Sequence, residues 1–146
     1  MILLDTNILV HAAGSKSPLY ERAKELRDRA VVGEVDACIA AQVLSEFYAI
    51  VTDPRRLRPP LAPTQAQRDL RNYLSSSLRL ILPKETSTAR MLDLLAHRSV
   101  RGGRIFDLFL AATMLDNGVH TIYTENVRDF KGLKGIEVIN PFLSTV

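Results

Sequence analysis

Short apolar runs alternate with longer stretches of helical periodicity, and this alternation constrains the fold more than any other feature of the sequence. The runs that predict strands are residues 2–4, 35–39, 78–82, 120–124 and 137–139. The first of them is wholly apolar, which is typical of a strand buried on both faces of a sheet. Strands that alternate with helices form right-handed βαβ units. We therefore expect an α/β fold in which helices cover both faces of a mostly parallel sheet.

The stretches between these runs predict the helices. Their expected ranges are residues 19–31, 41–52, 64–75, 88–97 and 105–116, with a short helix or turn at residues 8–10. Ser17 followed by Pro18, and a capping-box sequence that begins at Thr64, predict two of the helix starts. The range 105–116 is apolar almost all round, so we expect a buried helix there. Residues 53–63 hold four of the seven prolines and are expected to form a loop or arm.

The composition favours a single domain spanning residues 1–146. With 47% hydrophobic residues the chain can bury a full core, which excludes intrinsic disorder. Cys38 is the single cysteine, so an intrachain disulfide and a cysteine-based zinc site are excluded. We expect no signal peptide, no membrane-spanning segment and a cytoplasmic location. The net charge of +3 is mildly basic and compatible with a polyanionic partner.

Three acids occur at positions where a simple apolar core would not place them. Asp5 ends the first predicted strand, where α/β sheets carry functional groups, although it could equally cap the next helix. Glu46 lies at the edge of the apolar face of its helix, although an exposed helical glutamate is the commoner outcome. Asp107 heads an apolar stripe, where its role could also be limited to complementing the helix dipole.

A fourth polar site follows another predicted strand, at residues 124–130, and by itself is best explained as a solvated turn. Together the four sites can converge on one crevice, where clustered carboxylates repel one another unless a cation lies among them. Oxygen ligands favour Mg²⁺ or Mn²⁺ over zinc. The three histidines lack ligand-like spacing and are expected to be incidental, and nucleotide-binding and serine-hydrolase motifs are absent. Such an ion site on a basic domain predicts a phosphodiester substrate.

In these segments the sequence resembles PIN-domain ribonucleases, specifically the VapC-type toxins of type II toxin–antitoxin systems. The resemblance covers essentially the whole chain, through LDTNIL at residues 4–9, LSEF at 44–47, FDLFLAA at 106–112, TENVRDF at 124–130 and GIEVINP at 135–141. It implies a three-layer α/β/α sandwich with a mostly parallel central sheet. It also implies a Mg²⁺- or Mn²⁺-dependent endoribonuclease, a toxin that inhibits translation by cleaving RNA.

The resemblance further implies roles for individual residues. Asp5, Glu46 and Asp107 match the three acids that bind metal and catalyse cleavage in the family. The fourth acid of the family usually stands where this chain has Asn126, and Asp129 would complete the catalytic set in its place. The residues that would hold these acids in position are Thr6, Asn7, Thr124 and Asn126.

The partners implied by the resemblance are RNA, a cognate antitoxin and a second copy of the chain, while no membrane partner is expected. Arginines that precede or flank the acids are candidate phosphate contacts, although a solvated surface also explains them. These candidates are Arg55, Arg56, Arg58, Arg101 and Arg104.

Two other functions remain open from the sequence. A PIN-like fold that binds RNA or protein without cutting is favoured by the Asn126 departure, whereas the three remaining acids argue for catalysis. A phosphoryl-transfer domain of the receiver or haloacid-dehalogenase type also carries acids at strand ends. The latter needs a second acid two residues after the first, but Asn7 stands there.

Overall fold

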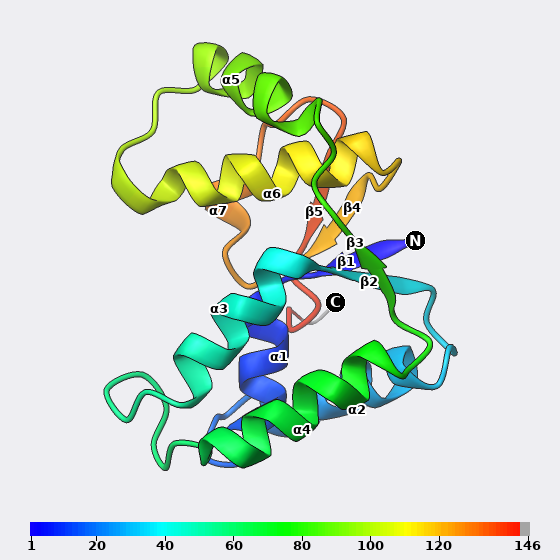
Figure 1. Cartoon of the computed structure of the whole chain (residues 1–146), viewed down its shortest axis with the longest axis vertical. Helices are drawn as coiled ribbons and strands as arrows, with labels where there is room; N and C mark the ends of the chain where they lie inside the picture. Colours follow the sequence, from blue (N-terminus) through cyan, green and yellow to red (C-terminus); the bar gives the residue numbers. More distant parts are fainter. Residues whose placement is uncertain (144–146) are drawn as a thin grey trace.

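The computed structural model describes residues 1–143 and has a five-stranded sheet at its centre (Figure 1). Its strands are β1 (Ile2–Leu4), β2 (Ala37–Ala40), β3 (Arg79–Ile81), β4 (Thr121–Tyr123) and β5 (Glu137–Ile139). They lie in the order β3-β2-β1-β4-β5, and every neighbouring pair is parallel. The predicted α/β fold with a parallel central sheet is therefore confirmed.

Helices cover both faces of this sheet and make three layers (Figure 1). One face carries α1 (Thr6–Ala13), α2 (Tyr20–Val31), α3 (Ala41–Val51) and α4 (Pro63–Leu74). The other carries α5 (Ser87–His97), the 3-10 turn η1 (Gly102–Arg104), α6 (Ile105–Asp116) and the short α7 (Val127–Phe130). The change of face follows from right-handed crossovers, because the chain moves from β1 toward β3 and then returns across the sheet to β4. Within residues 1–143 no helix is both long and apolar enough to cross a membrane.

The core lies between the sheet and each helical layer. Strand residues such as Leu3, Ile39 and Ile122 are fully buried, and they pack with Phe47 from α3 and Met114 from α6. Burial of these apolar side chains is the main driving force for folding.

The first turn of α6 departs from the prediction of a helix that is buried all round. Six of its residues between 108 and 114 are buried, but the ring of Phe106 is 70% exposed.

Two predicted helix starts are wrong in detail. Helix α4 begins at Pro63 rather than Thr64, and no side chain caps it. Proline favours the first helical position because its φ is already helical and its missing N–H would have no partner there. Helix α2 begins at Tyr20 rather than Leu19, but the Ser17 hydroxyl does accept a hydrogen bond from a free amide before the helix, that of Leu19, at 3.1 Å.

The proline-rich segment at residues 53–62 is a loop, as the sequence predicts, and it packs against the helices beside it. The amide of Leu61 donates to the carbonyl of Val51 at 2.7 Å, and Leu57 packs against the end of α1. A Cβ on Gly14 would lie 2.8 Å from Leu57 Cδ1, so the absence of a side chain at Gly14 permits this close approach. The loop is therefore fixed against the C-terminal ends of α1 and α3.

Candidate active site

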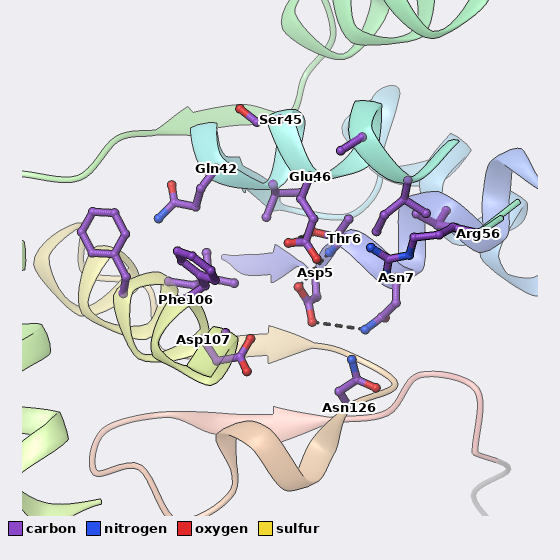
Figure 2. A pocket seen from close by; sticks show the side chains of 17 residues that line it. Asp5, Thr6, Asn7, Gln42, Ser45, Glu46, Arg56, Phe106, Asp107 and Asn126 are labelled. Carbon is purple, nitrogen blue, oxygen red and sulfur yellow. Dashed lines mark hydrogen bonds between the residues drawn. The ribbon is translucent and has the colours of Figure 1, made fainter. Parts of the chain in front are cut away.

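The candidate site lies where the order of the strands reverses. Strand β1 pairs with both β2 and β4, and these neighbours belong to crossovers on opposite faces of the sheet. Crevices of open α/β sheets form at such switch points, beyond the carboxyl ends of the strands. Here a cavity of about 680 Å³ opens between α3 and α6, and Asp5, Glu46, Asp107 and Asn126 line it (Figure 2).

Asp5 is the most firmly held acid of the site. It directly follows β1 and is only 8% exposed. Its Oδ1 accepts the amide of Thr6 at 2.8 Å, which caps α1, so the capping role considered from the sequence is real. Its Oδ2 accepts the Thr124 hydroxyl at 2.7 Å and the Asn7 side-chain amide at 3.2 Å. Three donors therefore fix both oxygens of this carboxylate.

Thr124 and Asn7 also hold each other. The side-chain amide of Asn7 donates to Thr124 Oγ1 at 3.0 Å, and its Oδ1 accepts the amide of Glu125 at 3.1 Å. Thr124 Oγ1 accepts the amide of Asn126 at 3.0 Å as well. The structure thus brings Asn7 and Thr124 onto Asp5, whereas Asn126 bonds through its backbone and directs its side chain to the cavity (Figure 2).

Glu46 reaches toward Asp5 from the second turn of α3 (Figure 2). Its Oε2 accepts the hydroxyl of Thr6 at 3.1 Å, although the residue itself is exposed. Thr6 therefore links the two acids, because its amide binds Asp5 and its hydroxyl binds Glu46.

Asp107 stands in the first turn of α6, and no side chain or amide of residues 1–143 donates a hydrogen bond to its carboxylate. Its pKa is raised from 3.8 to about 6. Burial is the main cause, followed by the negative charges of Asp129, Asp5 and Glu46, while Arg104 acts in the opposite direction. Because three other acids lie near Asp107, its role is not limited to complementing the dipole of α6.

The pKa of Asp5 is also raised, first by burial. Hydrogen bonds from Thr124 and Thr6 oppose the rise, and the charges of Glu46 and Asp129 add to it. The titrations of the four carboxylates are therefore electrostatically coupled.

Asp129 joins this group from α7, although it does not line the cavity. One carboxylate oxygen lies 3.4 Å from a guanidinium nitrogen of Arg104. The side chain of Arg98 fixes the same turn by donating to the carbonyls of Asp129, at 3.3 Å, and Lys131, at 2.6 Å. The structure thus supplies a fourth charge near the site even though Asn126 is not an acid.

The donor set fits a hard divalent cation in chemistry, since every candidate ligand is oxygen. Burial is the main reason that the pKa of Asp5 and of Asp107 is raised, and repulsion between the acids adds to it. A bound cation would relieve that repulsion. Within the described residues, however, no three acidic, histidine or cysteine side chains lie close enough together to enclose an ion. Asp5, Glu46 and Asp107 line one cavity, and binding an ion would require their side chains to turn toward a common point.

Comparison with known proteins agrees with this geometry. Residues 2–135 match the sequence profile of the PIN domain. The chain belongs to the PIN domain family. The matched range includes all four acids of the site.

Individual relatives match this PIN domain over nearly its whole length. Ribonuclease VapC48 of Mycobacterium tuberculosis is 29% identical over 139 residues, which cover 94% of this chain and 95% of the relative. Ribonuclease VapC24 of the same organism is 25% identical over 144 residues, 99% of each chain. A toxin–antitoxin complex from Klebsiella pneumoniae contains a chain of the same fold, with a TM-score of 0.65, 18% identity and coverage of 97% and 98%.

His11 has a place in the PIN domain that the sequence did not reveal. Its Nε2 lies 2.7 Å from a carboxylate oxygen of Glu125, and its Nδ1 lies 2.7 Å from the hydroxyl of Ser17. Glu125 belongs to the turn that positions Asn7, so His11 helps to fix that turn. The available signal was spacing, because residues four apart share one face of a helix and Asn7 precedes His11 by four.

The structure separates the five candidate arginines of the PIN domain. Arg55 forms an ion pair with Asp53 at 2.9 Å, and Arg58 donates to the carbonyl of Pro54 at 3.0 Å. Arg104 pairs with Asp129, and Arg101 is exposed but does not line the cavity. Arg56 is the one of the five that lines it (Figure 2).

Proposed function

We propose that this PIN domain is an endoribonuclease that hydrolyses RNA phosphodiester bonds with Mg²⁺ or Mn²⁺. The observation that carries the proposal is the group of three carboxylates, Asp5, Glu46 and Asp107, that line one open cavity with a fourth acid nearby, because the pKa of Asp5 and of Asp107 is raised there. The two relatives described above are named ribonucleases. We also propose a cytoplasmic location, where an RNA substrate would be found.

The residues of the site divide the work. When bound, the ion supplies Lewis acidity that activates water and neutralises charge on the leaving oxygen. Asp5 offers carboxylate oxygens in a fixed orientation, because three donors hold it. Glu46 is oriented by the Thr6 hydroxyl. Asp107 has no such restraint within residues 1–143, so its side chain is free to turn toward an ion or toward substrate.

The metal requirement is tested by chelation and restoration. The purified chain should cut single-stranded RNA with Mg²⁺ or Mn²⁺, lose the activity in excess chelator, and regain it when the ion is restored. Cleavage that continues undiminished in excess chelator would exclude the metal mechanism. A chain that binds the ion and RNA but never cuts would instead support the non-catalytic alternative.

That alternative rests on Asn126 and is the weaker of the two. The charge of Asp129 contributes to the raised pKa of both Asp5 and Asp107, so a fourth acid lies near the site although Asn126 is not one. Mutually repelling acids around a cavity are costly to a fold and are explained by catalysis rather than by binding alone.

Arg56 should contact the RNA backbone, and Arg55 should not, because Asp53 already neutralises Arg55. We expect Arg56→Ala to weaken RNA binding and to reduce the slope of log K against log salt by about 0.7 for one lost phosphate contact on a single strand. Arg55→Ala is the matched control and should leave the slope unchanged. Equal slopes for the wild type and both variants would mean that Arg56 does not contact phosphate and is only a solvated surface residue.

We further propose that the chain is the toxin of a toxin–antitoxin pair, a homodimer that is held inactive by a cognate antitoxin. The names of the VapC relatives and the toxin–antitoxin complex among the structural neighbours support this role. Expression of the chain alone in bacteria should arrest growth, and co-expression with the product of a small adjacent gene should restore it. Unimpaired growth at full expression of active enzyme would contradict the toxin role.

A further inference from the structure

One aromatic ring stands exposed beside the acid cluster. Phe106 directly precedes Asp107 and is 70% exposed, although large apolar side chains of this protein are mostly buried. Phe106 lines the cavity (Figure 2). Phe109 and Leu110 of the same helix line it as well. An exposed phenylalanine adds little to the core, and at the wall of this cavity its ring is available to a ligand.

The backbone next to the ring leaves part of it uncovered. A Cβ on Gly103 would lie 3.8 and 3.9 Å from the Cδ2 and Cε2 atoms of Phe106, which is ordinary van der Waals contact. Glycine has no such atom, so residue 103 places no side chain against this edge of the exposed ring. The φ of Gly103 is not in the left-handed region, so backbone strain does not require glycine here.

We propose that Phe106 forms a stacking site for one unpaired nucleobase of the RNA, immediately beside the carboxylates. This inference rests on the proposed ribonuclease function. Every nucleobase has a π-face, and stacking on an aromatic side chain is favourable and tolerant of sequence. Bases inside an A-form duplex are already stacked on both faces, so only a loop, bulge or single strand can use the ring.

The surroundings favour a nucleotide over a protein segment as the occupant. Within residues 1–143 the other strongly exposed large apolar side chains lie outside this cavity. Phe109 and Leu110 line it too, but the first is partly buried and the second is buried, so Phe106 is the one large apolar side chain that is strongly exposed there. Arg56 lines the same cavity and offers a cation for phosphate. A ring, a cation and a set of acids correspond to the base, the backbone and the reaction centre of a nuclease.

Two substitutions test the stacking site from different sides. Phe106→Leu removes the ring, and Gly103→Leu keeps the ring but places a side chain over it. Phe106→Tyr retains the aromatic face, and Val32→Ala is the control because Val32 is 64% exposed and does not line the cavity. Binding is measured with a fluorescent single-stranded oligoribonucleotide in the Asp107→Asn background, and KM and kcat are measured without that background change.

We expect Phe106→Leu and Gly103→Leu to weaken binding of the single strand roughly 5- to 100-fold, the scale of one base–aromatic stack. KM should rise by a similar factor with kcat little changed, because the contact is the same in the bound substrate and the transition state. Phe106→Tyr and Val32→Ala should bind as the parent does, and binding of duplex RNA should not respond to any of the four changes.

Two results would overturn the stacking site. The first is that the wild type is active on single strands and the Phe106→Leu variant binds and cuts them equally well. The second is that the Phe106→Leu and Gly103→Leu variants keep full RNA affinity but lose affinity for the antitoxin protein. That result would show that the ring is a contact for docking a protein. A wild-type chain that neither binds nor cuts RNA would refute the proposed function itself, so the two failures are distinguishable.

Discussion

Asp107→Asn should leave the ion-free protein at least as stable to heat as the wild type, although it changes a residue of the site. The pKa of Asp107 is raised to about 6, so at pH 7 the folded protein carries a carboxylate that it holds unfavourably. Asparagine keeps the shape and removes the charge. Melting curves at pH 7 without divalent ions should therefore give an equal or higher midpoint for the variant.

The pH dependence of this difference follows from the sign of the shift. A folded-state pKa above the unfolded value means that the folded protein binds the proton more tightly, so the charge destabilises only when it is present. The destabilisation is complete above about pH 6 and disappears as the pH falls toward 3.8. The gap between the two midpoints should therefore narrow steadily from pH 7 to pH 4.

Divalent ion should reverse the order of stability. Mg²⁺ that binds only the folded protein raises the midpoint by mass action, and it should do so more for the wild type than for Asp107→Asn. Glu21→Gln is the matched control, because Glu21 is an exposed acid in the first turn of α2, outside the cavity. The alternative is that Asp107 only complements the helix dipole. In that case the free energy of unfolding of Asp107→Asn would be lower by about 0.3–1 kcal/mol, and the variant would keep the full Mg²⁺ response.

Thr124→Val should destabilise the protein by about 1–3 kcal/mol and sharply reduce RNA cleavage. Thr124 is fully buried, and its hydroxyl donates to Asp5 while accepting from Asn7 and from the amide of Asn126. Valine matches the shape but leaves these groups without their partner. The midpoint of thermal unfolding should fall by several degrees, and the pKa of Asp5 should rise further because one hydrogen bond that lowers it is gone.

Thr124→Ser distinguishes the hydroxyl from the methyl group. Serine keeps the three hydrogen bonds and loses one buried methyl, so we expect stability and activity to decrease in the order wild type, Ser, Val. A valine variant as stable and active as the serine variant would mean that Thr124 acts by packing alone.

The parallel fold follows from local sequence because its strands are short, apolar and separated by helices of regular period. The position of Asp5 was predictable for the same reason, since the end of a buried strand fixes where the next side chain lies. The first residues of the helices were predicted less accurately. A threonine capping box at residue 64 and proline at residue 63 compete within one turn, and the proline sets the first helical residue.

Contacts between distant segments could not be predicted from one sequence. His11 and Glu125 are 114 residues apart, and their contact exists only because β4 lies beside β1. Arg55 and Arg56 are neighbours with the same charge, yet Asp53 engages the first while the second lines the cavity. The packing of Leu57 against Gly14 likewise depends on where the chain returns after α3. In each case the contact partner of the residue can be identified only once the fold is known.

The most direct test measures RNA cleavage as Mn²⁺ is added to metal-free wild type, Asp107→Asn and Glu21→Gln. The wild type and Glu21→Gln should be inactive without the ion and should reach the same saturating rate with it. Asp107→Asn should remain roughly 100-fold slower or more at every concentration, the scale of losing one catalytic group. Wild-type rates from Asp107→Asn, or cleavage by the metal-free wild type, would contradict a metal-dependent nuclease centre built on these acids.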